Sequence, residues 1–271
     1  MSYETIIYDA DDRVATIQFN RPERMNAFNT KLMDEINDAF IQAGQDPDVR
    51  VVIVKGLGGK AFSTGYDIKE SAEKPARTPA GWRDRVKRDL RFTDAPLTCS
   101  KPVIASIEGY CLGGGFEFAQ CCDIRYCAPD ARFSVVEARF ATGVSTLMLP
   151  WIVGPYARKM ILTGDEFGAD EAYRVGLVDD VFDKETIDAE VTKVARRMSR
   201  VAMEYLTLKK KALNETYDMM GLRNALNHAN SIAAVVSSSN PEEYKEYHRI
   251  KNEQGLKEAL KWRAALFAEY E

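Results

Sequence analysis

The order of strand-like and helix-like segments limits the folds open to this chain. Up to about residue 182, short runs rich in β-branched residues alternate with segments of helical periodicity. From about residue 184 the pattern is helical, with breaks at Gly221, at residues 237–241 and near Gly255. Mixed strands and helices followed by helices alone predict one α/β body with a helical C-terminal region.

Two strand pairs are predicted within the mixed part. Residues 5–8 and 13–19 form a hairpin around a turn at residues 10–12, and Asn29 is a good N-cap for the helix that follows. Residues 49–55 and 101–109 read as buried strands. Residues 123–128 and 131–137, separated by Pro129 and Asp130, predict a second hairpin whose last strand ends at Glu137.

Composition narrows the classes of function. The chain has 271 residues, 45% of them hydrophobic, which is enough for a sizeable core. It has 37 Lys and Arg residues and 41 Asp and Glu residues, and the resulting net charge of -4 argues against a dedicated nucleic-acid binder.

The cysteines and histidines point away from disulfides and zinc. Five cysteines are an odd number without CxxC spacing, and the two histidines, His228 and His248, lie in the C-terminal quarter. The N-terminus has no apolar signal region, and no stretch reaches membrane-spanning length. We therefore expect a cytoplasmic protein without a metal, and no membrane association.

The stretch GYCLGGGFEFAQCCDI, residues 109–124, places three glycines between a predicted strand and an apolar helix. The first amides of a helix lack internal partners and can bind a negatively charged oxygen. Glu117 falls in the first turn, where burial would raise its pKa and suit it to acid–base chemistry. A tight strand–helix turn with Glu117 as an ordinary helix-start acid explains the stretch equally well. The glycine spacing does not fit a dinucleotide-binding fingerprint.

Two further features could complete a site around these glycines. FSTGYDI, residues 62–68, is a second glycine-containing loop before a helix, and its backbone amide could join those near Gly114 in an oxyanion hole. Glu137 could converge with Glu117 on one cavity, and paired carboxylates can divide the roles of general acid and base.

Several motifs in order along the chain resemble the crotonase, or enoyl-CoA hydratase/isomerase, superfamily. The matching segments are NRPERMNAF, KAFSTGYDIKE, KPVIASIEGYCLGGGFEFAQCCDIRYCAPDARFSVVEARF, LTGDEFGADEAYRVGLVDDVF and GLKEALKWRAALF. The resemblance implies a crotonase-like spiral of ββα units over residues 1–200 that carries a CoA-thioester site. Residues 201–271 would form a helical trimerisation region, giving a homotrimer or a hexamer built as a dimer of trimers.

The resemblance also implies the site. Backbone amides of Tyr66 and Gly114 would hold the thioester oxygen, Glu117 would activate water, and Glu137 would exchange a proton with the α-carbon. Arg24 would contact the CoA phosphates. The other implied substrate-binding residues are Ala27, Ser63, Gly65, Asp67, Ile68, Gly113 and Ser145. No cofactor is implied, because coenzyme A is part of the substrate.

Both glutamates favour a lyase that adds water to a 2-enoyl-CoA. Double-bond isomerisation and carbon–carbon bond hydrolysis remain alternatives within the superfamily, and a non-catalytic RNA-associated or scaffolding role lies outside its chemistry. Tyr66 stands where the superfamily commonly has a small residue, and Ser145 replaces a glycine near the water site. Arg139 either turns inward to an acid or is solvated.

The segment 71–96 often lines the acyl pocket in this superfamily. Trp82, Leu90 and Phe92 are therefore candidates for acyl contacts, with core packing the simpler role for each of them.

Overall fold

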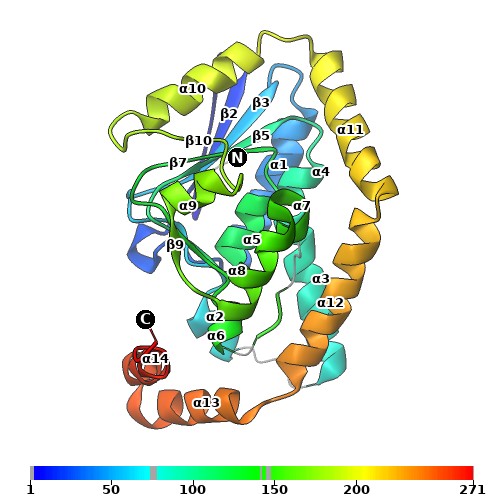
Figure 1. Ribbon diagram of the computed structural model, residues 1–271. Coiled ribbons are helices and arrows are strands. Elements are labelled where there is room, and N and C mark those ends of the chain that lie inside the picture. The colour runs from blue at the N-terminus through cyan, green and yellow to red at the C-terminus, as the bar shows by residue number, and fades with distance from the viewer. Residues whose placement is uncertain (1–2, 74–77, 141, 145–147, 271) are drawn as a thin grey trace.

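The computed structural model describes residues 3–73, 78–140, 142–144 and 148–270. Two sheets form the centre of the molecule, and helices surround them (Figure 1). The strands are β1 (Ile6–Asp11), β2 (Val14–Phe19), β3 (Val51–Gly56), β4 (Ala61–Ser63), β5 (Val103–Ile107), β6 (Tyr110–Leu112), β7 (Ile124–Cys127), β8 (Arg132–Ser134), β9 (Phe167–Gly168) and β10 (Asp180–Val181).

The helices are numbered in chain order. They are α1 (Thr30–Gln45), α2 (Ile68–Glu73), α3 (Pro79–Thr93), α4 (Ala95–Thr98), α5 (Gly114–Gln120), α6 (Glu137–Phe140), α7 (Leu149–Val153), α8 (Ala157–Thr163), α9 (Ala169–Arg174), α10 (Ile187–Met198), α11 (Met203–Met219), α12 (Leu222–Ser238), α13 (Glu242–Gln254) and α14 (Leu256–Ala265), with short 3-10 turns at Pro22–Arg24 and Gly154–Tyr156.

From β3 to β8, successive pairs of strands contribute one strand to each sheet. The larger sheet has the order β1-β2-β3-β5-β7-β10 and the smaller one β4-β6-β8-β9. Thus β3, β5 and β7 pair in parallel within the first sheet, while β4, β6 and β8 pair in parallel within the second. Each ββα unit therefore repeats the path of the one before it and stacks beside it.

Local sequence explains the first elements. β1 and β2 pair antiparallel as the predicted hairpin. Asn29 caps α1 by accepting a hydrogen bond from the Leu32 amide at 2.9 Å, and the apolar face of α1 is buried as its periodicity predicts. The prediction of an α/β body followed by helices is confirmed.

The predicted second hairpin is wrong. β7 and β8 belong to different sheets, and each pairs in parallel with the strand of the preceding unit. The last strand also ends at Ser134 rather than at Glu137, which begins α6. β8 loses its partner there, because β6 stops at Leu112 and the chain turns into α5.

The apolar helix α5 lies in the core, where it contacts β4, β6 and α3. All seven residues of α5 are buried. The ring of Phe118 lies 5.1 Å from that of Phe92 and 5.6 Å from that of Phe19, centroid to centroid, within a larger aromatic cluster. This packing fixes α5 and the carboxylate that it carries.

The C-terminal helices cover the outside. α10 packs its apolar face on the larger sheet, away from α1 and α5. α11 and α12 run along one side of the molecule, and α13 and α14 turn beneath it (Figure 1). There Tyr247 and Ala259 pack with Phe140 of α6. None of the described helices combines the length and the apolar composition that a membrane crossing requires.

Candidate active site

The turn into α5 presents backbone amides inside the protein, where the whole helix is buried. Gly113 has φ 52°, a conformation that favours glycine, and its amide donates to the Ser134 carbonyl at 3.1 Å. Glu117 lies in the first turn of α5 and is 3% exposed, so the predicted burial is confirmed.

The second glycine loop meets this turn backbone to backbone. Gly65 has φ 85°, and a Cβ atom built on it would lie 2.9 Å from the Gly114 nitrogen, so only glycine permits this approach. The Phe28 amide donates to Gly65, and the Asp67 amide donates to Phe28. The amides of Tyr66 and Gly114 donate to no residue in the described part of the chain.

Glu137 reaches the same place from the start of α6. A Cβ atom on Gly113 would lie 2.9 Å from Glu137 Oε1, which shows how close the carboxylate lies to the glycine turn. The residue is half-buried, but Oε2 is buried and has no hydrogen-bond partner among the described residues. Burial raises the pKa of Glu137 from 4.5 to about 7.

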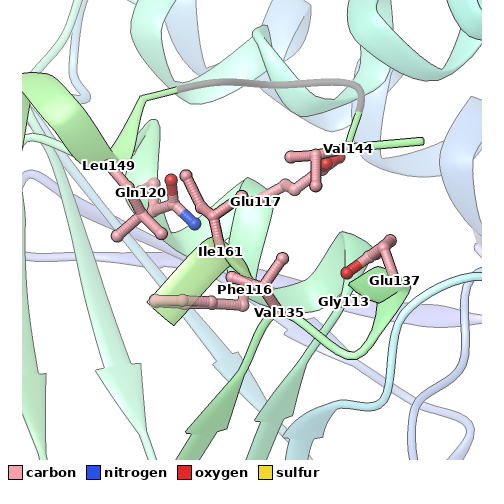
Figure 2. Close-up of a pocket in the computed structure, with 9 residues that line it drawn as sticks. All are labelled: Gly113, Phe116, Glu117, Gln120, Val135, Glu137, Val144, Leu149 and Ile161. Carbon is pink, nitrogen blue, oxygen red and sulfur yellow. The ribbon is translucent and has the colours of Figure 1, made fainter. Parts of the chain in front are cut away.

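Glu117 and Glu137 line one cavity (Figure 2). Its volume is about 10 Å³, close to the room that one water molecule needs. Apart from Gly113, Gln120 and the two glutamates, its walls are apolar: Phe116, Val135, Val144, Leu149 and Ile161. Two carboxylates facing one water-sized space inside an apolar wall can act as acid and base on the same small group.

The Tyr66 side chain lies against the turn into α5. A Cβ atom on Gly114 would lie 2.5 Å from Tyr66 Cε2 and 2.8 Å from Cδ2, so the ring lies directly on the glycine. Burial raises the pKa of the Tyr66 phenol, and the charges of Asp89, Glu117 and Glu137 raise it further. The phenol therefore stays protonated at neutral pH.

Arg21, which the sequence patterns did not single out, braces the loop. Its guanidinium binds the Asp67 carboxylate at 3.0 Å and also donates to the Ala27 carbonyl. Asp67 Oδ1 accepts from the Lys69 amide at 3.0 Å, and so caps α2. Arg21 belongs to the NRPERMNAF motif, and this membership could have marked it as a site residue. The motif's other arginine, Arg24, was assigned a role instead, as a contact to the CoA phosphates.

Other predicted site residues take various positions. Ser63 is buried and its hydroxyl donates to the Asn26 carbonyl at 2.8 Å, which makes it a brace of the loop. Arg24 and Ile68 are exposed, and Ala27 is half-buried. Ser145 lies outside the described residues.

Arg139 pairs with an acid, as the first of its two predicted positions requires, and is only partly exposed. It pairs with Asp165 at 2.9 Å and lies 4.6 Å from the centroid of the Phe267 ring. Of the acyl-pocket candidates, Phe92 is buried in the aromatic cluster, while Trp82 and Leu90 are half-buried.

The described residues contain no cluster of three or more His, Cys, Asp or Glu side chains that could hold a metal ion. The five cysteines are free and buried.

The chain is similar to known proteins over most of its length. Residues 9–251 match the enoyl-CoA hydratase/isomerase family. A crotonyl-CoA hydratase of Syntrophomonas wolfei is 36% identical over 86% of this chain and 88% of its own length. The mitochondrial Delta(3,5)-Delta(2,4)-dienoyl-CoA isomerase of Rattus norvegicus is 37% identical over 67% of this chain and 59% of its own length.

Among solved structures, an enoyl-CoA hydratase/isomerase from Xanthobacter autotrophicus Py2 superposes with a TM-score of 0.95 at 34% identity, over 98% of this chain and 99% of that one. The crotonase-like fold expected from the motifs is therefore confirmed. The chain belongs to the enoyl-CoA hydratase/isomerase family, the crotonase superfamily that its motifs indicated.

Proposed function

We propose that this protein is a hydro-lyase that adds water across the double bond of a 2-enoyl-CoA thioester. The observation that carries the proposal is the cavity that Glu117 and Glu137 share beside the turn into α5. Its volume of about 10 Å³ suits a single water molecule between the two carboxylates. The similarity to the crotonyl-CoA hydratase supports the same chemistry.

The backbone amides would stabilise the intermediate. In the proposed reaction, the thioester oxygen accepts hydrogen bonds from the amides of Tyr66 and Gly114, which have no other described acceptor. When water attacks the β-carbon, the electron pair of the double bond moves toward this oxygen and gives an enolate. Donors aimed at such a charge typically contribute about 3–4 kcal/mol each to the transition state.

The glutamates would divide the proton transfers. Glu117 removes a proton from water while the water oxygen bonds to the β-carbon. Glu137 delivers a proton to the α-carbon. The pKa of about 7 suits Glu137 to this role, because a sizeable fraction of the group carries a proton at neutral pH. The net change is the addition of one water, and later exchange with solvent restores both carboxyl groups.

Mass spectrometry tests the proposal. Purified protein is incubated with a mixture of short-chain, long-chain and aryl 2-enoyl-CoA thioesters. We expect a gain of one water on at least one member. If no member gains water while the α-protons of saturated acyl-CoAs exchange with heavy water, the enolate site is real and the reaction is another.

Double-bond isomerisation is the second candidate, and the similarity to the dienoyl-CoA isomerase favours it. An isomerase moves a proton along the acyl chain and needs no water as a reactant. Glu117→Gln separates the two reactions: a hydratase loses water addition in this variant, whereas an isomerase that works through Glu137 retains proton exchange.

We also propose that residues 201–271 assemble a homotrimer or a dimer of trimers, while residues 1–200 carry the CoA-thioester site. Exposed apolar side chains on α11 and α12 support this: Tyr205, Leu208, Leu213, Met219, Ile232 and Val235. Light scattering should give three or six times the chain mass of 30.5 kDa. A monomer mass would contradict the proposal.

The cytoplasmic location and the absence of a separate cofactor stay predictions.

A further inference from the structure

We propose that the ring of Tyr66 limits the length of the acyl group that this enzyme accepts, by separating the glutamate cavity from a larger pocket beyond it. The inference rests on the proposed acyl-CoA site. It concerns the size of the substrate and not the reaction performed on it.

Contacts on two sides fix the ring. One edge lies on Gly114, where Cε2 approaches within 2.5 Å of the position that a Cβ atom would take. On another side, the Phe28 ring meets it edge-on, with 6.4 Å between centroids. Phe28 itself is 1% exposed and packs on Phe92 and Phe118, so it cannot readily move to make room.

Two separate spaces lie near this region. The first is the cavity of about 10 Å³ that Glu117 and Glu137 line (Figure 2). The second is a pocket of about 370 Å³ between α1, α2 and α3, which is apolar at Phe28, Met33 and the Tyr66 ring and mostly polar or charged elsewhere. No described residue lines both spaces.

Tyr66 is linked to both. It lines the larger pocket, while its ring touches Gly114, the neighbour of the cavity-lining Gly113. The charges of Glu117 and Glu137 act on its phenol. In the path that we propose, an acyl chain that extends from the glutamates toward the larger pocket passes the ring. That pocket lies within the volume range of small-molecule sites.

The phenol oxygen offers a matched control. It is buried, and it has no hydrogen-bond partner among the described residues. Tyr66→Phe therefore removes no hydrogen bond between described residues and keeps the ring, whereas Tyr66→Ala removes both ring and hydroxyl. The comparison assigns any change in length preference to the ring or to the hydroxyl.

The experiment measures kcat/KM for hydration of 2-enoyl-CoA thioesters with four, six, eight and ten carbons. For each protein the result is the ratio of the ten-carbon to the four-carbon value, which cancels general damage to the site. We expect wild type and Tyr66→Phe to share a ratio well below one. Tyr66→Ala should raise it about tenfold or more, since one methylene in a pocket is worth about 10–200-fold.

Two results would overturn the inference: an unchanged ratio in Tyr66→Ala, or an equal rise in Tyr66→Phe, which would place the effect in the hydroxyl. If Tyr66→Ala does not fold, Tyr66→Leu serves in its place, because leucine keeps an apolar contact with Phe28.

Binding separates this inference from the proposed reaction. Calorimetry with saturated acyl-CoAs of the same lengths measures the length preference without chemistry. If no thioester is hydrated but Tyr66→Ala still gains affinity for the ten-carbon chain, the reaction proposal fails and the inference about Tyr66 stands. If thioesters are hydrated with no length effect in either variant, the reaction proposal stands and the inference about Tyr66 fails.

Discussion

Glu137→Gln should change how the stability of the protein depends on pH. Burial raises the pKa of Glu137 from 4.5 to about 7, so the folded protein binds this proton more tightly than the unfolded chain does. The resulting stabilisation is fully present below pH 4.5 and is lost as the pH rises through about 7. Above that pH, the folded protein carries a desolvated carboxylate.

The size of the effect follows from the shift. At about 1.4 kcal/mol per pKa unit, the stabilisation lost between pH 5 and pH 8 is about 2.5 kcal/mol. Glutamine has the same shape and no titration. The free energy of unfolding of wild type minus that of Glu137→Gln should therefore fall by about this amount across the range.

Urea denaturation at fixed protein concentration measures this difference at pH 5, 6, 7 and 8. Titrations of distant groups largely cancel, because the two proteins differ at one residue. Parallel stability curves for the two proteins would mean that the pKa of Glu137 is not raised and that its carboxyl is in contact with solvent. A difference that rises with pH would mean that an unrecognised cation stabilises the charged form.

Three further predictions concern Gly114 and Arg21. Gly114→Ala places a Cβ atom 2.5 Å from Tyr66 Cε2 and should lower the free energy of unfolding by about 1–3 kcal/mol. This cost should largely vanish in the Tyr66→Ala background. Additive costs in a double-mutant cycle would show that the ring does not rest on this glycine. Gly114→Pro adds a similar Cβ but deletes the amide, so its kcat should fall about 100–1000-fold below that of Gly114→Ala; equal turnover would place the oxyanion hole elsewhere. Arg21→Gln leaves the Asp67 carboxylate without its guanidinium partner, and denaturation should show a loss of about 1–3 kcal/mol; unchanged stability would mean that the pair is screened by water.

Sequence patterns located the residues whose environment is set by near neighbours. The glycine triplet before an apolar helix placed Glu117 in a buried first turn, and the described structure agrees. The N-cap of α1 and the first hairpin were likewise predicted, because a cap or a tight turn depends on a few adjacent residues.

Pairing between strands that are distant in the chain was harder to predict from the sequence. Residues 131–137 alternate as a strand would, yet the strand stops at Ser134 because its neighbour β6 ends at Leu112. A strand continues only while another offers hydrogen bonds, and local periodicity carries no information about that partner. The same limit produced the wrong hairpin, since β7 and β8 pair with earlier units rather than with each other.

Contacts between loops were the hardest to foresee. Arg21 and Asp67 are 46 positions apart, and their ion pair becomes visible only when the first motif and the glycine loop lie side by side. Tyr66 was recognised as an unusual residue, but its contact with Gly114 depends on the folded backbone.

The most direct test of the central claim follows the fate of solvent atoms. Crotonyl-CoA is incubated with wild type, Glu117→Gln and Glu137→Gln in heavy water, and the products are analysed by mass spectrometry. We expect wild type to add one water, with deuterium at the α-carbon, and each variant to be slower by orders of magnitude while remaining folded. Water addition at the wild-type rate by either variant would contradict the roles given to the two glutamates.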